Sequence, residues 1–406
     1  MMCRILPLAG AALALAACSD PTRPPSASST VDASSPLAAD SVFTRYVALG
    51  TSNSMGVQSA GISAAGQRAA WPAQLAARIP GVAFSLPLVQ DPGCNPPLVA
   101  PLAADIALVA TFGEADAGNE LVQSVMTTCE PLQDGITLPT NSVAISGANV
   151  HDALFATPES ATVRSARVGT LYSRVLAPGE TQVTAMLAQR PTFVSVELAA
   201  NEVLPASRGD VSAMTPYADW ERDYDSVVAA VRSTGARAVL VGLPADAANF
   251  PSIRHATELF DERAELLRLG IVVSPACASS SNYLFIPGYL LTLLSRVPTT
   301  ATCADVPGTD DFVLTPDDMN VIDARMARMN AHIQAKANEG GYAYFTLGAL
   351  YDLPKPVFSV HDLFFSNTPF GPNISLDGVH PSASGQTILA DSAAQAIDAR
   401  YGLAIP

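Results

Sequence analysis

Residues 44–56 read TRYVALGTSNSMG, and this segment determines how the rest of the chain is interpreted. The run from Thr44 to Gly50 is rich in β-forming residues, ends in a glycine and is followed by Thr51 and Ser52. A short apolar run bounded by a turn signal predicts a buried strand. If the strand belongs to a parallel sheet, its carboxyl end is where such proteins place their sites. We therefore expect Ser52 to lie at a strand end that carries chemistry.

The remaining sequence predicts an α/β fold with a parallel sheet. Strands are expected at 81–89, 142–147, 192–198, 237–244 and 342–347, and helices at 67–79, 217–233, 316–338 and 382–401. For the third helix, Thr315 is the expected cap and Pro316 suits the first turn. Strands alternate with helices and most are continuously apolar, which predicts a sheet covered by helices on both faces.

Two further strands end in turns that carry possible oxyanion donors, and a fourth segment carries an acid and a base. The strand at 142–147 ends at Gly147, and the strand at 192–198 is followed by Asn201. Near the C-terminus, residues 375–382 read SLDGVHPS and place Asp377 three residues before His380. A carboxylate so placed can hold one ring nitrogen of a histidine and leave the other as a base. With the hydroxyl of Ser52, these groups form the set that nucleophilic catalysis requires.

In order and content, these segments resemble the four motif blocks of the SGNH hydrolases, also called GDSL esterases and lipases. YVALGTSNSMG, SVAISGANV, VSVELAANEVL and DGVHPSASG occur in the order of the family's blocks, and they span residues 45–400. The resemblance implies a three-layer α/β/α sandwich with a flavodoxin-like parallel sheet. It implies a serine esterase in which Ser52 is the nucleophile, His380 the general base and Asp377 the orienting acid. The N–H groups of Ser52 and Gly147, with the Asn201 amide, would hold the oxyanion, and no metal or organic cofactor is needed.

Two positions depart from the family's pattern. Thr51 stands where an Asp usually precedes the serine, and Ala199 stands where a Gly usually lies two residues before the asparagine. The first departure questions the hydrogen bonding of the nucleophile turn, and the second adds a methyl group near the oxyanion site. Two alternatives therefore stay open: a weakly active or inactive surface lipoprotein that binds envelope lipid or glycan, and an O-acyltransferase.

The N-terminal segment predicts export and lipid anchoring. Residues 1–17 carry Arg4 as their only charge, followed by a short apolar run and a small-residue site directly before Cys18. This pattern indicates a secretory signal and is too short for a membrane span. It resembles a bacterial lipoprotein signal in which Cys18 is lipidated. Residues 18–40 are rich in Ser, Ala and Pro and predict a flexible tether, with one hydrolase domain over 41–406. Ser19 after the cysteine favours the outer membrane of a Gram-negative bacterium.

Composition limits the partners of this 406-residue chain. It has 22 Lys and Arg against 37 Asp and Glu, a formal charge of −15, so a general nucleic-acid partner is not expected. The expected partners are a small-molecule, lipid or glycan ester as substrate and, through the anchor, a membrane.

Four cysteines remain once Cys3 leaves with the signal and Cys18 takes the lipid. They lie in two Pro-rich insertions, at about 90–140 and 245–314. An even set in an exported protein indicates disulfides, and the pairing between neighbours in sequence joins Cys94 to Cys129 and Cys277 to Cys303. Two other pairings are formally possible. A metal site is not expected, because no C-x-x-C spacing occurs.

Overall fold

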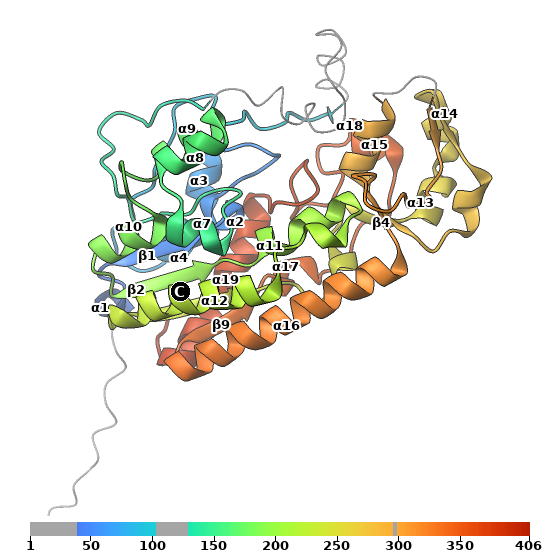
Figure 1. The fold of residues 1–406 in the computed structure, drawn as a ribbon. Coiled ribbons are helices and arrows are strands. Elements are labelled where there is room, and N and C mark those ends of the chain that lie inside the picture. The colour runs from blue at the N-terminus through green and yellow to red at the C-terminus, as the bar shows by residue number, and fades with distance from the viewer. Residues whose placement is uncertain (1–38, 103–128, 295–298) are drawn as a thin grey trace, which may run out of the picture. The chain divides into compact units, whose positions relative to one another are not determined.

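The computed structural model describes residues 39–102, 129–294 and 299–406. Four strands form a parallel sheet in the order β1-β2-β3-β9 (Figure 1). They are β1 (Tyr46–Gly50), β2 (Phe193–Glu197), β3 (Arg237–Gly242) and β9 (Ala343–Thr346). The expected signal segment 1–17, Cys18 and nearly all of the expected tether lie outside the described residues.

The strand predicted at 142–147 is not a regular strand, but its first residues run beside β1, with an isolated parallel bridge between Ser142 and Ala48. Val143 N donates to Ala48 O at 2.9 Å, and Ile145 N donates to Gly50 O at 3.0 Å. Residues 142–145 follow β1 in the sequence but lie on the side of β1 that faces away from β2, as the second strand does in the flavodoxin-like order. The predicted α/β fold with a central parallel sheet is confirmed.

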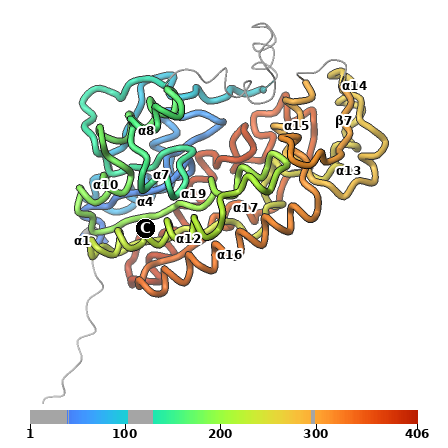
Figure 2. The backbone as a smooth tube through the Cα atoms, in the orientation of Figure 1, coloured from blue at the N-terminus to red at the C-terminus, as the bar shows by residue number. Residues whose placement is uncertain are grey.

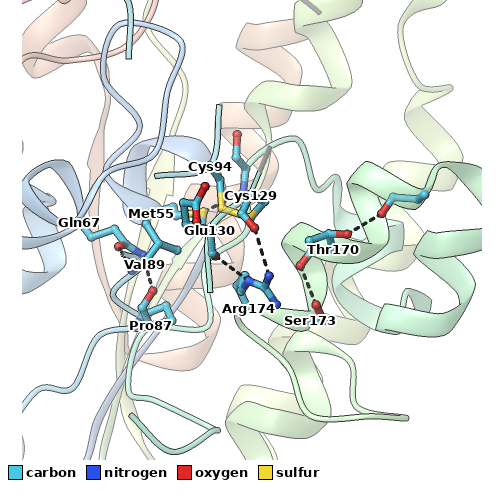
Figure 3. Close-up of a disulfide and its surroundings, with 12 residues drawn as sticks. Met55, Gln67, Pro87, Val89, Cys94, Cys129, Glu130, Thr170, Ser173 and Arg174 are labelled. Atoms are coloured by element: carbon cyan, nitrogen blue, oxygen red, sulfur yellow. Dashed lines mark hydrogen bonds between the residues drawn. A yellow bond between two sulfur atoms is a disulfide. The ribbon is translucent and has the colours of Figure 1, made fainter. Parts of the chain in front are cut away.

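The strand predicted at 81–89 is wrong. These residues form no regular strand, and only Val89 makes an isolated bridge, to Leu132. The side chain of Gln67 forms hydrogen bonds with the backbone groups that a neighbouring strand would otherwise bind. Its amide nitrogen donates to Pro87 O at 2.6 Å, and its amide oxygen accepts from Val89 N at 3.0 Å (Figure 3).

The helices follow the expected alternation with the strands. In the first half of the chain they are α1 (Ala39–Val42), α2 (Ser52–Met55), α3 (Ala64–Ala69), α4 (Trp71–Ala77), α7 (Val150–Phe155), α8 (Pro158–Arg164), α9 (Ala166–Ser173), α10 (Gln182–Ala188) and α11 (Ala200–Val203). In the second half they are α12 (Tyr217–Ser233), α13 (Ala256–Asp261), α14 (Arg263–Arg268), α15 (Ile286–Leu294), α16 (Pro316–Gly340), α17 (Gly348–Tyr351), α18 (Val360–Phe365) and α19 (Ala383–Tyr401). Short 3₁₀ helices are η1 (Leu204–Arg208), η2 (Val211–Ala213), η3 (Ala247–Asn249) and η4 (Pro275–Ser279).

Successive side chains of the strands enter two separate cores, because they alternate between the faces of the sheet. Val47 and Leu49 of β1 belong to the core shared with α7, α10, α12 and α16. Tyr46 and Ala48 belong to the core shared with α4 and α19. In Figures 1 and 2, α12 and α16 run side by side along one face of the sheet. Helices on both faces give the predicted three layers.

Two helix predictions show how local chemistry sets helix boundaries. The start of α16 is confirmed: Thr315 Oγ1 accepts from Asp318 N at 3.1 Å, and the Asp318 carboxylate accepts from Thr315 N at 2.8 Å. The single helix predicted over 67–79 is divided into α3 and α4. Ala70, with ψ of 140°, interrupts it just before Trp71-Pro72.

Both insertions carry the expected disulfides. Cys94 is bonded to Cys129 in the first insertion, where Arg174 donates to the carbonyl of Cys129 at 3.1 Å (Figure 3). Cys277 is bonded to Cys303 in the second. The second insertion builds an antiparallel sheet in the order β4-β6-β8, of β4 (Ile253–His255), β6 (Tyr283–Phe285) and β8 (Val313–Leu314). It also contains the parallel pair β5 (Ile271–Val273) and β7 (Thr299–Ala301).

Candidate active site

Ser52 lies at the carboxyl end of β1, as predicted, and begins α2. Its carbonyl accepts hydrogen bonds from the N–H groups of Gly56 and Val57, both at 3.0 Å, which closes a tight turn. Gly50 is required here because a Cβ atom would lie 2.5 Å from the hydroxyl of Ser54. Ser52 is 8% exposed, and neither its N–H nor its hydroxyl has a protein hydrogen-bond partner among the described residues. Both groups are free to interact with a ligand.

Glu197, at the end of β2, holds the turn that carries Ser52. Its carboxylate accepts from the backbone N–H of Thr51 at 3.1 Å and of Ser54 at 3.3 Å. It also accepts from the Thr51 hydroxyl at 2.9 Å and the Ser54 hydroxyl at 3.0 Å. Burial raises the pKa of Glu197, and the bonds from Thr51 and Ser54 oppose that rise. The carboxylate next to the serine turn thus comes from the neighbouring strand, while position 51 contributes a donor.

Asp377 and His380 form a hydrogen-bonded pair, as their spacing predicted. His380 Nδ1 lies 2.8 Å from Asp377 Oδ2, and the other carboxylate oxygen accepts from the N–H groups of Val379 and His380. Gly378, with φ of 72°, makes this fold possible, since a Cβ atom there would lie 2.8 Å from the ring of Phe370. Burial alone raises the pKa of Asp377, but His380 and these hydrogen bonds lower it to about 2. Because an ionised carboxylate only accepts, the neutral His380 ring would carry its proton on Nδ1, which leaves Nε2 as an acceptor.

Hydrogen bonds join the segment after Ser52 to the segment around Asp377. Ser59 N donates to Ser375 Oγ at 2.8 Å, and Ala60 N donates to Asp377 Oδ2 at 2.5 Å. Gln386 of α19 adds a third link, because its amide nitrogen donates to Asn53 O at 3.0 Å. These bonds span more than 300 residues of sequence and fix the two segments against each other.

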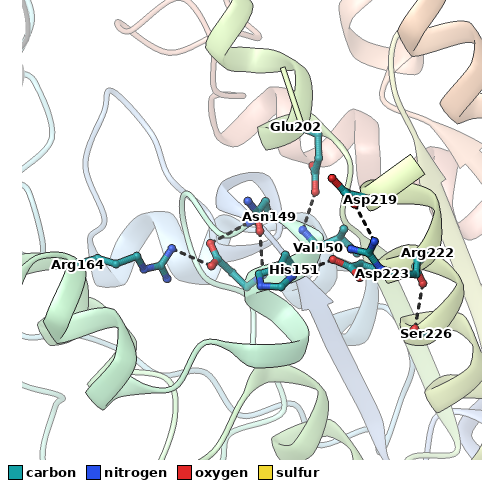
Figure 4. Close-up of polar contacts among 10 residues, drawn as sticks. Asn149, Val150, His151, Arg164, Glu202, Asp219, Arg222, Asp223 and Ser226 are labelled. Carbon is teal, nitrogen blue, oxygen red and sulfur yellow. Dashed lines mark hydrogen bonds and ion pairs between the residues drawn. The ribbon is translucent and has the colours of Figure 1, made fainter. Parts of the chain in front are cut away.

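Asn201 and Glu202 hold the loop that contains Gly147. The Asn201 amide nitrogen donates to Ala148 O at 2.7 Å. Glu202 Oε1 accepts from Val150 N at 2.6 Å, as Figure 4 shows. Burial raises the pKa of Glu202 to about 7, and its second oxygen, Oε2, is buried without a partner among the described residues. An amide has two hydrogens, so Asn201 retains one after binding Ala148.

One pocket brings together three of the residues predicted from sequence. Ser52, Asn201 and His380 all line it. Asp377 lies behind His380 and contacts the pocket through it. Gly147 is not among the lining residues; it is exposed in a turn with φ of 77°. The methyl group of Ala199 does not line the pocket either, because the next residue, Ala200, takes that place.

Sequence reasoning missed the residues that hold these groups in place. Glu197 was the visible signal, as the one charged side chain in the apolar run TFVSVEL. Tyr351, which is 2% exposed and donates to Val379 O at 2.6 Å, had no such signal. Neither did Gln386, since its partner Asn53 is brought near only by the fold.

Among the residues that the structure describes, no group of three or more His, Cys, Asp or Glu side chains could hold a metal ion. None of the helices in the described ranges combines the length and apolarity needed to span a membrane.

Comparison with known proteins gives distant structural similarity only. No family model and no curated protein matches the chain. Similar solved structures include a mutant of Axe2, an acetyl-xylooligosaccharide esterase from Geobacillus stearothermophilus, at 12% identity over 87% of this chain and 93% of that chain, with a TM-score of 0.35. An extracellular lipase from Streptomyces rimosus is 15% identical over 86% and 98%, with a TM-score of 0.34. The esterase EstA from Pseudoalteromonas sp. is 11% identical over 88% and 97%, with a TM-score of 0.32. These similar structures are esterases and lipases.

Proposed function

We propose that this chain is a serine ester hydrolase of the SGNH type that works through an acyl-enzyme on Ser52. The observation that carries the proposal is the shared pocket of Ser52 and His380, with His380 held by a partly buried, ionised Asp377. A hydroxyl, an imidazole with a free Nε2 and an acid behind it are the groups that acyl transfer requires.

In the first half of the reaction, His380 Nε2 takes the proton of the Ser52 hydroxyl as Oγ bonds to the ester carbonyl carbon. Asp377 keeps the ring in the correct tautomer and stabilises the imidazolium that forms. The imidazolium then gives its proton to the alcohol oxygen as the carbon–oxygen bond breaks. The alcohol leaves, and the acyl group stays on Ser52.

In the second half, water attacks the acyl-enzyme. His380 takes a proton from the water and returns it to Ser52 Oγ as the acid leaves. Each tetrahedral intermediate carries an oxyanion. The free N–H of Ser52 and the second amide hydrogen of Asn201 are the donors that the pocket offers, whereas Gly147, the third donor expected from the sequence, lies outside the pocket lining in this structure. Donors that are fixed before reaction stabilise this charge without reorganisation.

The bonding of Thr51 favours the hydrolase over a degenerate binding module. Thr51 replaces the family's usual Asp, yet its N–H and hydroxyl are both bound by the Glu197 carboxylate. The serine turn is therefore fully supported despite the departure. We further propose that lipid on Cys18 anchors the enzyme to the outer membrane of a Gram-negative cell envelope.

The test is hydrolysis of p-nitrophenyl esters by residues 39–406, comparing wild type with Ser52→Ala. Ser207→Ala is the matched control, since Ser207 lines the same pocket, and the hydrogen bonds of Asp377 among the described residues do not include it. We expect the first variant to lose activity and the control to keep it. Asn201→Ala should lose roughly 10²–10³-fold in kcat. Equal turnover by wild type and Ser52→Ala would contradict the proposal.

A further inference from the structure

Most of the residues that line the pocket beside Ser52 are apolar, and this lining indicates the class of ester that the enzyme would accept. We infer, on the basis of that proposed function, that the enzyme prefers esters with an apolar acyl chain longer than acetyl. The second insertion supplies one wall of the pocket that makes this choice.

The first wall of the pocket is one face of the insertion's antiparallel sheet. Ile253 of β4 lies directly opposite Phe285 of β6, so both side chains point to the same face. Leu314 of β8 lies opposite Tyr283, two residues before Phe285, and therefore shares that face. Ile253, Phe285 and Leu314 all line the pocket. A sheet face that presents only apolar side chains to a cavity recognises an apolar group.

The second wall combines α16 with the ends of the central strands. Ile322 and Met326 lie four residues apart, on the same face of α16, and both line the pocket. Leu243 follows β3, and Leu347 follows β9. All four are at most 4% exposed, so this end of the pocket is closed off from water.

The lining of the pocket disfavours charged acyl groups. Among the described residues that line it, none is Asp, Glu, Lys or Arg. Its polar side chains are those of Ser52, Asn53, Asn201, Ser207, Ser252, Tyr351 and His380. A charged acyl group would lose its hydration without gaining an Asp, Glu, Lys or Arg side chain as an ion-pair partner, which is costly. An alkyl chain gains free energy from the same transfer.

The lining favours an acyl chain longer than acetyl. Acetyl carries a single methyl group and would leave most of the apolar wall uncovered, whereas each added methylene buries more apolar surface against Phe285, Ile322 and Met326.

One end of the pocket is open to solvent and the other is buried, and this difference determines how the substrate lies in it. Asn201, Leu204 and His380 are partly exposed, whereas Leu314 and Met326 are buried. The acyl chain therefore points toward α16, and the alcohol part lies toward solvent, where it is weakly selected.

The experiment measures kcat/KM for p-nitrophenyl acetate, butanoate, hexanoate and decanoate, each normalised to the ester's spontaneous hydrolysis. We expect a rise of about fourfold per methylene from acetate to butanoate, and a higher kcat/KM for hexanoate than for butanoate. Met326→Ala should lower the hexanoate-to-acetate ratio, because it removes apolar lining from the pocket. Met329→Ala is the matched control, because Met329 is equally buried on the same helix but does not line the pocket.

A second pair of variants keeps the inference testable if Met326→Ala does not fold. Ala247 lines the pocket and Ala248 does not, so Ala247→Leu should lower the hexanoate-to-acetate ratio while Ala248→Leu keeps it. Preference for acetate or a flat profile, with Ser52→Ala inactive, would overturn the inference and leave the hydrolase intact. Equal shifts in Met326→Ala and Met329→Ala would also overturn it. No turnover of any ester, with no reaction of Ser52 with a fluorophosphonate, would instead overturn the proposed function and the inference together.

Discussion

Glu197 supplies the carboxylate that the turn around Ser52 lacks in its own sequence. Thr51 and Ser54, the residues on either side of the Ser52–Asn53 pair, each give it a backbone N–H and a hydroxyl. All four donors are buried, so removing their acceptor would leave them unpaired. Each unpaired buried donor costs about 1–3 kcal/mol. Glu197 therefore both stabilises the fold and positions the proposed nucleophile.

Replacing this acceptor gives a prediction at the residue scale. Glu197→Thr should lose about 3 kcal/mol of unfolding free energy and most of kcat, with a smaller change in KM. Thr51→Asp combined with Glu197→Thr returns a carboxylate to the turn from the other side. Urea unfolding and ester kinetics should show partial recovery of both quantities in the double variant. A double variant no better than Glu197→Thr would refute the positioning role.

Glu202 gives a pH-dependent prediction. Its pKa is raised by burial to about 7, so the native state holds a proton that the unfolded state has released. Stability from this group is therefore lost as pH rises from about 4.5 to about 7, by an amount on the order of 3 kcal/mol.

Urea unfolding at pH 5 and pH 8 checks this prediction, with Glu202→Gln as the comparison, because glutamine does not titrate. The wild type should lose more stability over this interval than the variant. Identical pH dependence in the two proteins would show that Glu202 titrates normally.

At this scale the sequence pointed to the groups of the proposed mechanism, which the structure brings to one pocket, but not to the residues that hold them in place. Ser52, Asp377 and His380 lie in short motifs whose spacing carries the chemistry. Glu197 and Gln386 act on residues more than 100 positions away, and such pairs are defined only once the sheet and α19 are packed.

At the scale of elements, the second insertion carries the pocket wall and is closed by Cys277–Cys303. The bond joins residues 26 positions apart, and on the chain-entropy account a loop of this size is stabilised by about 3–4 kcal/mol. The cysteine pairing between sequence neighbours was predictable. The β4-β6-β8 sheet was not, because strands of two and three residues have no periodicity that could be recognised.

Removing each disulfide in turn distinguishes the roles of the two insertions in stability and in ester preference. Replacing both Cys277 and Cys303 by Ala should cost about 3 kcal/mol and weaken the preference for hexanoate over acetate. The same change at Cys94 and Cys129 is the control, because neither residue lines the pocket; it should cost a similar amount and leave the preference unchanged. Thermal unfolding and the ester profile measure the two effects. Loss of preference in both variants would contradict the assignment of the wall to the second insertion.

At the scale of the whole molecule, the proposed lipid anchor explains how a chain of charge −15 would stay at a membrane. Charge would not hold it at an anionic surface, whereas an acyl chain gains about 0.8 kcal/mol per buried methylene. Cys18→Ser should move the protein from the membrane fraction of a Gram-negative host to the soluble fraction. Cys3→Ser is the matched control and should stay in the membrane fraction. Identical fractionation of the two variants would contradict the anchor.

The central claim is that Ser52 is a nucleophile activated by His380. Labelling by a fluorophosphonate probe, followed by mass spectrometry of the labelled peptide, tests it without assuming a substrate. The account predicts one label per chain on Ser52, and a large loss of labelling rate in His380→Ala. Absence of label, or label on another serine with Ser52 unmodified, would contradict it.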